Sequence, residues 1–364
     1  MNQQLFLEMI DAAINGKTID LSEVDEEFIR VAKEQTFLPF LYVASKDKKY
    51  KKYYIQSVLI HERINEVGKL IDDILNEAKI PHIFLKGYEL QNLYPDPNLR
   101  MMGDIDLIVK PEDFDKAAKS ILNVELFKFE YDDEHHMGII ANGIEVELHH
   151  NLFEDYRYLS SYFDDCFVVS KNNNLYKYEL LHNAQLIYIS GHYAKHLNGG
   201  EGLRPILDIY MILLKDNNYP TEELKKLGLY DFFEMILCTI NKIFNINYKV
   251  SKNNKYVNDF INYTLYSGIH GKNLDLNQKE EITYNKKQSK FLFIISKIFC
   301  PIKDIFKQYK WSKLIITLPL AYLCRFFFLL KTKKKKINKF MATKKNEYNK
   351  MFESIKIMDA NNKY

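Results

Sequence analysis

The stretch from His82 to Val109 constrains the fold more than any other part of the chain, because it places two carboxylates on one face of an apolar strand. Asp104 and Asp106 alternate there with isoleucine, leucine and valine. Residues two apart in a strand point to the same side, so both carboxylates would face one point while the apolar residues pack. Convergent carboxylates are costly unless a cation neutralises them. The sequence therefore predicts a divalent cation, with magnesium as the obvious candidate.

A candidate phosphate-binding turn precedes the two acids. Lys79-Ile80-Pro81 breaks a helix, and the short apolar run 83–85 that follows is typical of a buried strand. Gly87 then permits a close approach of the backbone, and residues 88–93 would open a helix whose free amide groups face an anion. The pair of Lys86 with this glycine is a weak signal alone, and it becomes informative because the two acids follow it.

A hairpin supplies a third carboxylate. Asn142-Gly143 separates two apolar runs, and both turn residues tolerate positive φ. The return strand, 144–148, leads Glu145, Glu147 and the following His149 onto one face. Two interpretations of Glu145 stay open, namely an exposed hairpin residue without a function and a general base.

A helical segment near residue 190 carries a cluster of polar residues. His192, Lys195 and His196 stand three and four apart, so they share one face of a helix. His192 and His196 also have the spacing of a zinc site, but Tyr193 stands where a His-Glu-x-x-His protease carries its glutamate. We therefore favour the second wall of an active-site cleft over a zinc site.

The Gly-rich loop 198–202 leads into a second pair of charged residues. Arg204 and Asp208 lie one helical turn apart. They would either extend the polar wall of the cleft or form a weak intrahelical ion pair. Both interpretations stay open.

The order of these motifs is similar to that of a known group of enzymes. The chain resembles the nucleotidyltransferase superfamily in Leu-Lys-Gly at 85–87, Leu-Tyr at 93–94, Arg100, Asp-Ile-Asp-Leu-Ile-Val at 104–109 and Val-Glu-Leu-His-His at 146–150. It is most similar to bacterial proteins labelled only as uncharacterised nucleotidyltransferases, which are often associated with surface polysaccharide loci. The resemblance covers about residues 80–210. It implies an α+β fold of the DNA polymerase beta type, with a small mixed β-sheet core flanked by N-terminal helices and a C-terminal helical domain.

The same resemblance implies a metal site. Asp104, Asp106 and Glu147 would be the catalytic ligands of two magnesium ions, with glutamate at 147 where the resembled proteins usually carry aspartate. His149 would orient the acid or the nucleotide, and a structural hydrogen bond is the alternative role.

The resemblance also implies residues that bind the nucleotide. Lys86, Gly87 and Arg100 would lie on the phosphates of an NTP, although related enzymes usually place Gly-Ser or Gly-Gly at this turn. The helical region of the resembled proteins carries a similar polar series, so the second wall of the cleft would comprise His192, Lys195, His196, Arg204 and Asp208.

The implied reaction moves an NMP from an NTP to a hydroxyl acceptor and releases pyrophosphate. The acceptor stays open, because this fold fixes the metal chemistry and leaves the second wall free to vary. Two alternatives compete with it. Some metal-dependent glycosyltransferases also use Asp-x-Asp, but here the motif follows too little chain for a full nucleotide-sugar domain. The second alternative is a nucleotide-binding regulatory protein with a degenerate transferase core.

Patterning divides the chain into four parts. Residues 1–78 are predicted to be helical, with an amphipathic stripe over 64–78 that would pack beside the sheet. The nucleotidyltransferase core is expected over 79–155 and a helical domain, which forms the second wall, over 156–290. Residues 291–364 form apolar and basic C-terminal helices with a tail.

Charge and cysteine content limit the cellular setting. The formal charge of +3 gives no strong signal for a nucleic-acid partner. Four scattered cysteines without a Cys-x-x-Cys pair argue against disulfides and a thiolate zinc site. The first residues lack a basic and uninterrupted apolar signal sequence. We therefore expect a cytoplasmic protein.

The C-terminal part has one further candidate partner. The apolar run 314–330 contains a proline and an arginine and falls short of a comfortable transmembrane helix. Trp311 precedes it and a lysine cluster at 331–336 follows it, so residues 311–340 would suit an anionic membrane surface at the inner face. Helices that pack on the protein's own core are the alternative.

Overall fold

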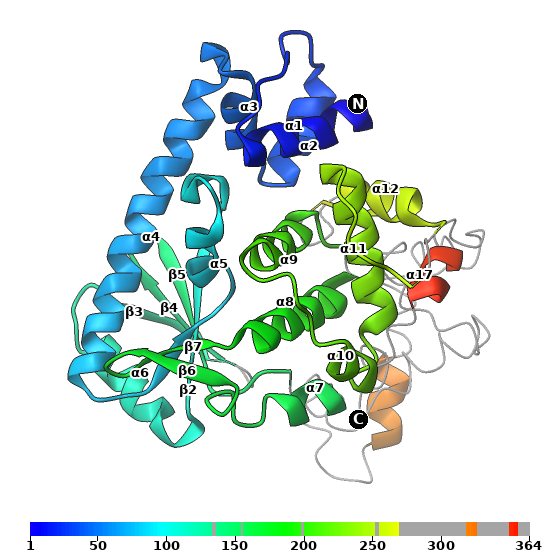
Figure 1. Cartoon of the computed structure of the whole chain (residues 1–364). Coiled ribbons are helices and arrows are strands. Elements are labelled where there is room, and N and C mark those ends of the chain that lie inside the picture. The colour runs from blue at the N-terminus through cyan, green and yellow to red at the C-terminus, as the bar shows by residue number, and fades with distance from the viewer. Residues whose placement is uncertain are drawn as a thin grey trace.

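A seven-stranded mixed sheet forms the centre of the part of the chain that the computed structural model describes, namely residues 1–132, 136–153, 156–197, 200–251, 255–268, 318–325 and 349–355. Helices from both ends of the sequence surround this sheet (Figure 1). The arrangement confirms the predicted α+β class.

The first part of the chain is helical, as predicted. It forms α1 (Gln3–Asn15), α2 (Glu26–Glu34), α3 (Leu38–Ser45), the short 3-10 helix η1 (Lys48–Tyr50) and α4 (Lys51–Glu77). Local chemistry sets their ends: the side chain of Asp25 accepts a hydrogen bond of 2.7 Å from the amide of Phe28, which caps α2. The long α4 runs along one side of the sheet (Figure 1).

The sheet has the strand order β3-β4-β5-β2-β1-β7-β6. Its strands are β1 (His82–Phe84), β2 (Asp104–Val109), β3 (Lys128–Asp132), β4 (His136–Ala141), β5 (Ile144–His149), β6 (Ser170–Asn174) and β7 (Lys177–Leu180). Two pairs are parallel, β2 with β5 and β1 with β7, and the other pairs are antiparallel. The predicted hairpin turn between β4 and β5 is confirmed, since Asn142 and Gly143 have φ of 50° and 73°.

One face of the sheet is apolar and packs against α4 and α6 (Phe114–Leu122), which follows the 3-10 helix η4 (Pro111–Asp113). Side chains from both helices and from the central strands form this core, among them Ile71, Ile121, Ile105, Leu107 and Val146. The alternate residues of β2 and β5 therefore point to the opposite face, toward the C-terminal helices.

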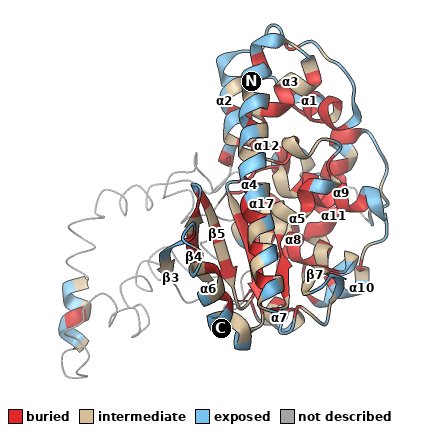
Figure 2. Ribbon diagram, turned by 90° about the vertical axis from the view of Figure 1, so that its left-hand side faces the viewer, coloured by how far each residue is buried: buried red, intermediate tan, exposed pale blue. Residues whose placement is uncertain are grey.

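The connection from β1 to β2 holds the short α5 (Lys86–Leu90) and the 3-10 helices η2 (Gln91–Leu93) and η3 (Pro97–Leu99). After the sheet come α7 (Arg157–Tyr162), α8 (His182–Leu197), α9 (Arg204–Lys215), α10 (Thr221–Lys226), α11 (Tyr230–Phe244), α12 (Val257–Ser267) and α17 (Asn349–Ile355). Their apolar faces share a core with α1 to α3, and the buried residues concentrate between these helices (Figure 2).

The sheet extends beyond the boundary at residue 155 that the sequence suggested. Residues from about 175 onward were predicted to be helical, yet β7 pairs in parallel with β1 and carries β6 as an edge strand. The mostly exposed sequence Ser-Lys-Asn-Asn-Asn of β6 has no apolar alternation, so its pairing comes from the neighbouring strand rather than from its own pattern.

Most of the C-terminal part lies outside the described residues. Trp311 and the lysine cluster at 331–336 belong to that part, so the membrane surface as a partner of 311–340 stays a prediction. Among the helices that the structure describes, none combines the length and apolar character needed to cross a membrane.

Candidate active site

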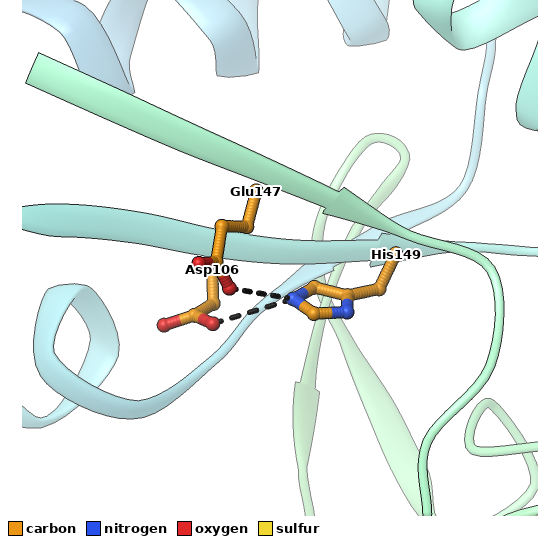
Figure 3. A group of neighbouring side chains, drawn as sticks. All are labelled: Asp106, Glu147 and His149. Carbon is orange, nitrogen blue, oxygen red and sulfur yellow. Dashed lines mark hydrogen bonds and ion pairs between the residues drawn. The ribbon is translucent and has the colours of Figure 1, made fainter. Parts of the chain in front are cut away.

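Three polar side chains converge on the face of the sheet opposite α4. Asp106 comes from β2, and Glu147 and His149 come from β5 (Figure 3). The parallel register places Asp106 beside Glu147, and all three offer ligand atoms that lie within 4.8 Å of one another. Among the described residues, these three side chains form the group that could hold a metal ion. The group includes Asp106 and Glu147, two of the three acids predicted to bind metal.

The histidine ring bridges the two carboxylates. His149 Nε2 lies 3.3 Å from Asp106 Oδ1 and 3.3 Å from Glu147 Oε2. Burial disfavours the charged ring, but hydrogen bonds to Asp106 and Glu147 outweigh it and raise the pKa of His149. The two carboxylates therefore favour the charged form of the ring.

A second cation lies on the same oxygen. Lys86 Nζ donates to Asp106 Oδ1 over 2.7 Å. Although burial favours the neutral acid, Lys86 and His149 hold the pKa of Asp106 well below its usual range. Burial opposes the charge of Lys86 as well, yet the carboxylate raises the pKa of this lysine above its ordinary value. The pair is ionic and nearly shielded from water, because Asp106 is only 3% exposed.

Asp104 lies on the same face of β2 but outside the group of three. Its register partner on β5 is Glu145. Burial and the neighbouring charge of Asp106 raise the pKa of Asp104, so a bound cation would favour its ionised form.

The predicted phosphate-binding turn adopts an unusual backbone. Lys86 has φ of 47°, and α5 begins at this residue rather than at Tyr88. A Cβ atom on Gly87 would lie 3.1 Å from Met102 Sδ and 3.3 Å from Arg100 Nη1. A side chain at this position would therefore require small shifts of Met102 and Arg100, and the predicted approach of the backbone to a phosphate stays a prediction.

Arg100 is held by a buried acid. Its Nε and Nη2 atoms donate to Asp208 Oδ1 and Oδ2 over 2.6 and 2.8 Å, and Tyr94 adds a hydrogen bond of 2.7 Å to Oδ1. This bidentate pair lies almost fully buried, with 5% and 3% of the side chains exposed. Asp208 thus has Arg100 as its partner, and the intrahelical pair of Asp208 with Arg204 does not form.

A cavity of about 370 Å³ opens above Asp106. This volume lies in the range of small-molecule sites. Four parts of the chain line it: the end of α2, the β1–β2 region, the start of β5, and the helical segment from α8 to α9. The lining residues are Lys33, Glu34, Thr36, Lys86, Gly87, Arg100, Met102, Gly103, Asp104, Asp106, Glu145, Ile189, His192, Glu201, Arg204, Pro205 and Asp208.

The polar face predicted on α8 divides in two. His192 lines the cavity, and burial together with Lys86 lowers the pKa of His192 well below its usual value, so the ring is neutral. Lys195 is exposed, and neither Lys195 nor His196 belongs to the lining. The rings of His192 and His196 lie 4.5 Å apart between centroids.

Glu145 takes part in a hydrogen-bonded network on β3 and β4. Tyr131 donates to Glu145 Oε1 over 2.8 Å, and the Nε2 atom of His136 lies 3.0 Å from the same phenol oxygen. His136 in turn lies 3.7 Å from Glu147 Oε1. Glu145 is thus partly buried and bonded, and it lines the cavity.

Sequence reasoning missed the contribution of α2. Lys33, Glu34 and Thr36 reach the cavity although they lie far from the acids in the sequence. No local signal identifies them, because α2 reads as an ordinary amphipathic helix. Glu201 stands in the Gly-rich loop that the sequence did mark, and its buried carboxylate also lines the cavity.

The three ligand candidates fit a divalent cation. Asp106 and Glu147 offer carboxylate oxygens, which are the ligands that magnesium prefers. Asp104, a third acid, lies two residues before Asp106 on β2. The imidazole of His149 fits either as a ligand or as a hydrogen-bond donor that orients the acids.

Comparisons with known proteins were consistent with this site. The model of a family described as "uncharacterised nucleotidyltransferase" matches residues 25–245, which include all the residues of the cavity. No curated protein matches the chain. Among solved structures, the chain is similar to one described as the antibiotic-resistance factor ANT(2'')-Ia, with 10% identity over 52% of this chain and 96% of that chain and a TM-score of 0.33. A likeness this distant says nothing more about the chain.

Proposed function

We propose that this chain, which belongs to the uncharacterised nucleotidyltransferase family, moves an NMP from an NTP to a hydroxyl group of an acceptor and releases pyrophosphate. Membership makes it a nucleotidyltransferase, and the finer assignments below are our own. The observation that carries them is the in-register parallel pairing of β2 with β5, which sets Glu147 beside Asp106, and Asp106 lines the cavity.

The acids would hold magnesium. Asp106 and Glu147 supply oxygens for one ion, and Asp104 with Asp106 would supply them for a second. Bound magnesium lowers the pKa of a hydroxyl and neutralises developing phosphate charge. His149 holds both carboxylates in place through its Nε2 atom.

The residues around the acids would position the two substrates. Lys86 exchanges Asp106 for the NTP phosphates when the acid takes up its cation, and Gly87 lets the phosphates approach the backbone. Arg100 lines the cavity and would add positive charge near the phosphates, while its ion pair with Asp208 holds its side chain in place. His192 is a neutral imidazole that faces the acceptor side and can accept its proton.

A labelling assay tests this function. The protein is incubated with magnesium, each α-labelled NTP in turn, and candidate acceptors that include sugar phosphates, aminoglycosides, proteins and tRNA. We expect labelled acceptor and pyrophosphate in equal amounts, and neither product from Asp106→Asn. Sugar transfer from a nucleotide sugar without pyrophosphate, or tight NTP binding without turnover, would contradict the proposal.

The cellular setting is proposed on the sequence motifs alone. Surface polysaccharide metabolism would supply hydroxyl acceptors inside the cell, and a sugar phosphate is therefore the first acceptor to assay.

A further inference from the structure

Arg204 is a partly buried cation of the cavity wall, and Glu201, Asp208 and Asp104 attract it without forming an ion pair among the described residues. It is the first residue of α9, and its Nη1 atom donates to the carbonyl oxygen of Met101 over 3.2 Å. Arg100 Nη1 donates to the same oxygen over 3.1 Å, so the two guanidinium groups are neighbours. Asp208 neutralises Arg100, whereas no carboxylate of the described residues forms an ion pair with Arg204. Burial and the charge of Arg100 lower the pKa of Arg204 accordingly. An anion in the cavity would relieve this repulsion.

Thr36 adds an unusual hydroxyl to the same cavity. It follows α2, and the amide of Phe37 donates to the carbonyl of Ala32, which closes the turn that ends the helix. This position favours glycine because its φ is positive, and Thr36 has φ of 60°. Of the described non-glycine residues with positive φ, Thr36 is the one whose side chain is branched at Cβ. Strain of this kind persists where a function maintains it.

The hydroxyl of Thr36 also lacks a partner. Its oxygen is buried and makes no hydrogen bond in the described protein, although buried hydroxyls almost always make one. Removing the strain would require only a glycine. A polar group of a ligand beside Thr36 would supply the missing hydrogen bond.

A single side chain brings Thr36 and Arg204 together. Gln35 is fully buried, and its Oε1 atom accepts a hydrogen bond of 2.9 Å from the amide of Leu203. Thr36 follows Gln35 in the sequence, Arg204 follows Leu203, and both Thr36 and Arg204 line the cavity. They form one corner of it, which we name the Thr36–Arg204 corner.

We propose that the Thr36–Arg204 corner binds a phosphate or carboxylate group of the acceptor, which makes the acceptor an anionic molecule. This inference rests on the proposed nucleotidyl transfer. A guanidinium and a hydroxyl donor suit such an oxyanion, and the N-terminal end of α9 adds favourable electrostatic potential beside Arg204. The corner is separate from the Lys86–Gly87 turn, which has its own lysine and close backbone approach for the NTP. The terminal phosphate of the NTP is the other source of such a group, and the test separates the two.

Calorimetry with inorganic phosphate as the probe tests the corner. The full chain is first saturated with magnesium and a non-hydrolysable analogue of the NTP that the labelling assay selects, so that phosphate finds only the acceptor side. Arg204→Gln removes the charge, and Thr36→Val removes the hydroxyl while keeping the branched shape. Lys215→Gln is the matched control, because it removes an exposed positive charge from the other end of α9.

We expect phosphate to bind the wild type, about tenfold or more weakly to Arg204→Gln, and about threefold more weakly to Thr36→Val. Lys215→Gln should match the wild type, and all four proteins should bind the NTP analogue equally. Thr36→Gly should bind phosphate as weakly as Thr36→Val but melt at a higher temperature, since glycine relieves the strain.

Two results would overturn the proposal. Phosphate that binds Arg204→Gln as tightly as the wild type would show that the corner is not an anion site. A parallel loss of NTP-analogue binding in Arg204→Gln would assign the corner to the nucleotide. Failure of the wild type to bind the analogue with magnesium would instead contradict the proposed function, and it would leave any Arg204-dependent phosphate binding as a separate result.

Discussion

Lys86 Nζ lies 2.7 Å from Asp106 Oδ1, so a lysine from the turn predicted to bind phosphate is bonded to one of the three candidate metal ligands. In the proposed site, a metal ion would replace Lys86 as the cation bound to Asp106. Lys86 would then be free to bind the phosphates of the nucleotide. Metal and nucleotide would therefore bind cooperatively.

The first prediction tests this competition. Lys86→Met should bind manganese about tenfold more tightly in the absence of nucleotide, because the acid loses its internal cation. Its turnover should nevertheless fall, because the phosphates lose a positive charge. Paramagnetic resonance of free Mn²⁺ measures the affinity, with Lys110→Met at the end of β2 as the control. Unchanged manganese affinity would contradict the competition.

The second prediction separates the two glutamates of β5. Glu147→Gln should lower kcat by about two orders of magnitude, because it removes a metal-binding carboxylate. Glu145→Gln should have a much smaller effect, since the amide oxygen can still accept from Tyr131. Steady-state kinetics at saturating magnesium decides between them. Equal losses in the two variants would assign Glu145 a catalytic role.

The third prediction concerns stability. Asp208→Asn should lower the free energy of unfolding by about 3–5 kcal/mol, because it leaves the buried guanidinium of Arg100 without its counter-ion. Lys69→Ala breaks the exposed ion pair of Lys69 with Asp73, whose side chains are 77% and 60% exposed. This change should lower the free energy of unfolding by less than about 1 kcal/mol. Urea unfolding measures both. Similar values for the two variants would show that the buried pair is not a structural support of the wall.

The fourth prediction concerns pH. The ring of His82 is fully buried between the carbonyl oxygen of Ile80 and Asp72 Oδ1, each 2.9 Å from a ring nitrogen. Burial alone would raise the pKa of Asp72, but the hydrogen bond and charge of His82 lower it. Because the folded-state pKa lies below the unfolded value, the stability from this group is present above about pH 4 and is lost as the pH falls through the folded-state pKa.

Urea unfolding between pH 7 and pH 2 measures this dependence. The acid-induced loss of stability should be smaller in Asp72→Asn than in the wild type, by at most about 1 kcal/mol, because Asp72 is partly exposed to solvent. Identical pH profiles for the two proteins would rule out a contribution from the pair.

The fifth prediction compares two residues of α8. His192→Gln should lower the transfer rate about tenfold, since the neutral ring lines the cavity beside the acids. Lys195→Gln should retain wild-type kinetics, because its side chain is exposed and lies outside the lining. An equal effect of the two changes would mean that the helix face acts as a unit, as its spacing alone suggested.

The central acids of the candidate site could be predicted from the sequence, because their placement depends on patterns among neighbouring residues. Alternation from Asp104 to Val109 identifies a strand with two carboxylates on one face, and Asn142-Gly143 fixes the register of the hairpin that delivers Glu147. These features depend on residues a few positions apart, so periodicity and turn chemistry suffice to find them.

The rest of the site depends on contacts that no local pattern encodes. Arg100 pairs with Asp208 across 108 positions, and no local pattern links these two residues. Thr36 enters the cavity only because α2 packs against the second wall. The edge strand β6 forms because β7 offers it hydrogen bonds, and its asparagine-rich sequence is typical of a loop.

The side chain of Gln35 joins three distant segments. Besides accepting from Leu203, it donates to the carbonyl oxygens of Thr264 and Leu265 over 2.8 and 3.2 Å, across sequence separations of 229 and 230. The amide of Gln35 thus joins the end of α2 to the start of α9 and to the C-terminal part of α12. A movement of the first helices toward a molecule bound in the cavity would consequently have to break these three hydrogen bonds.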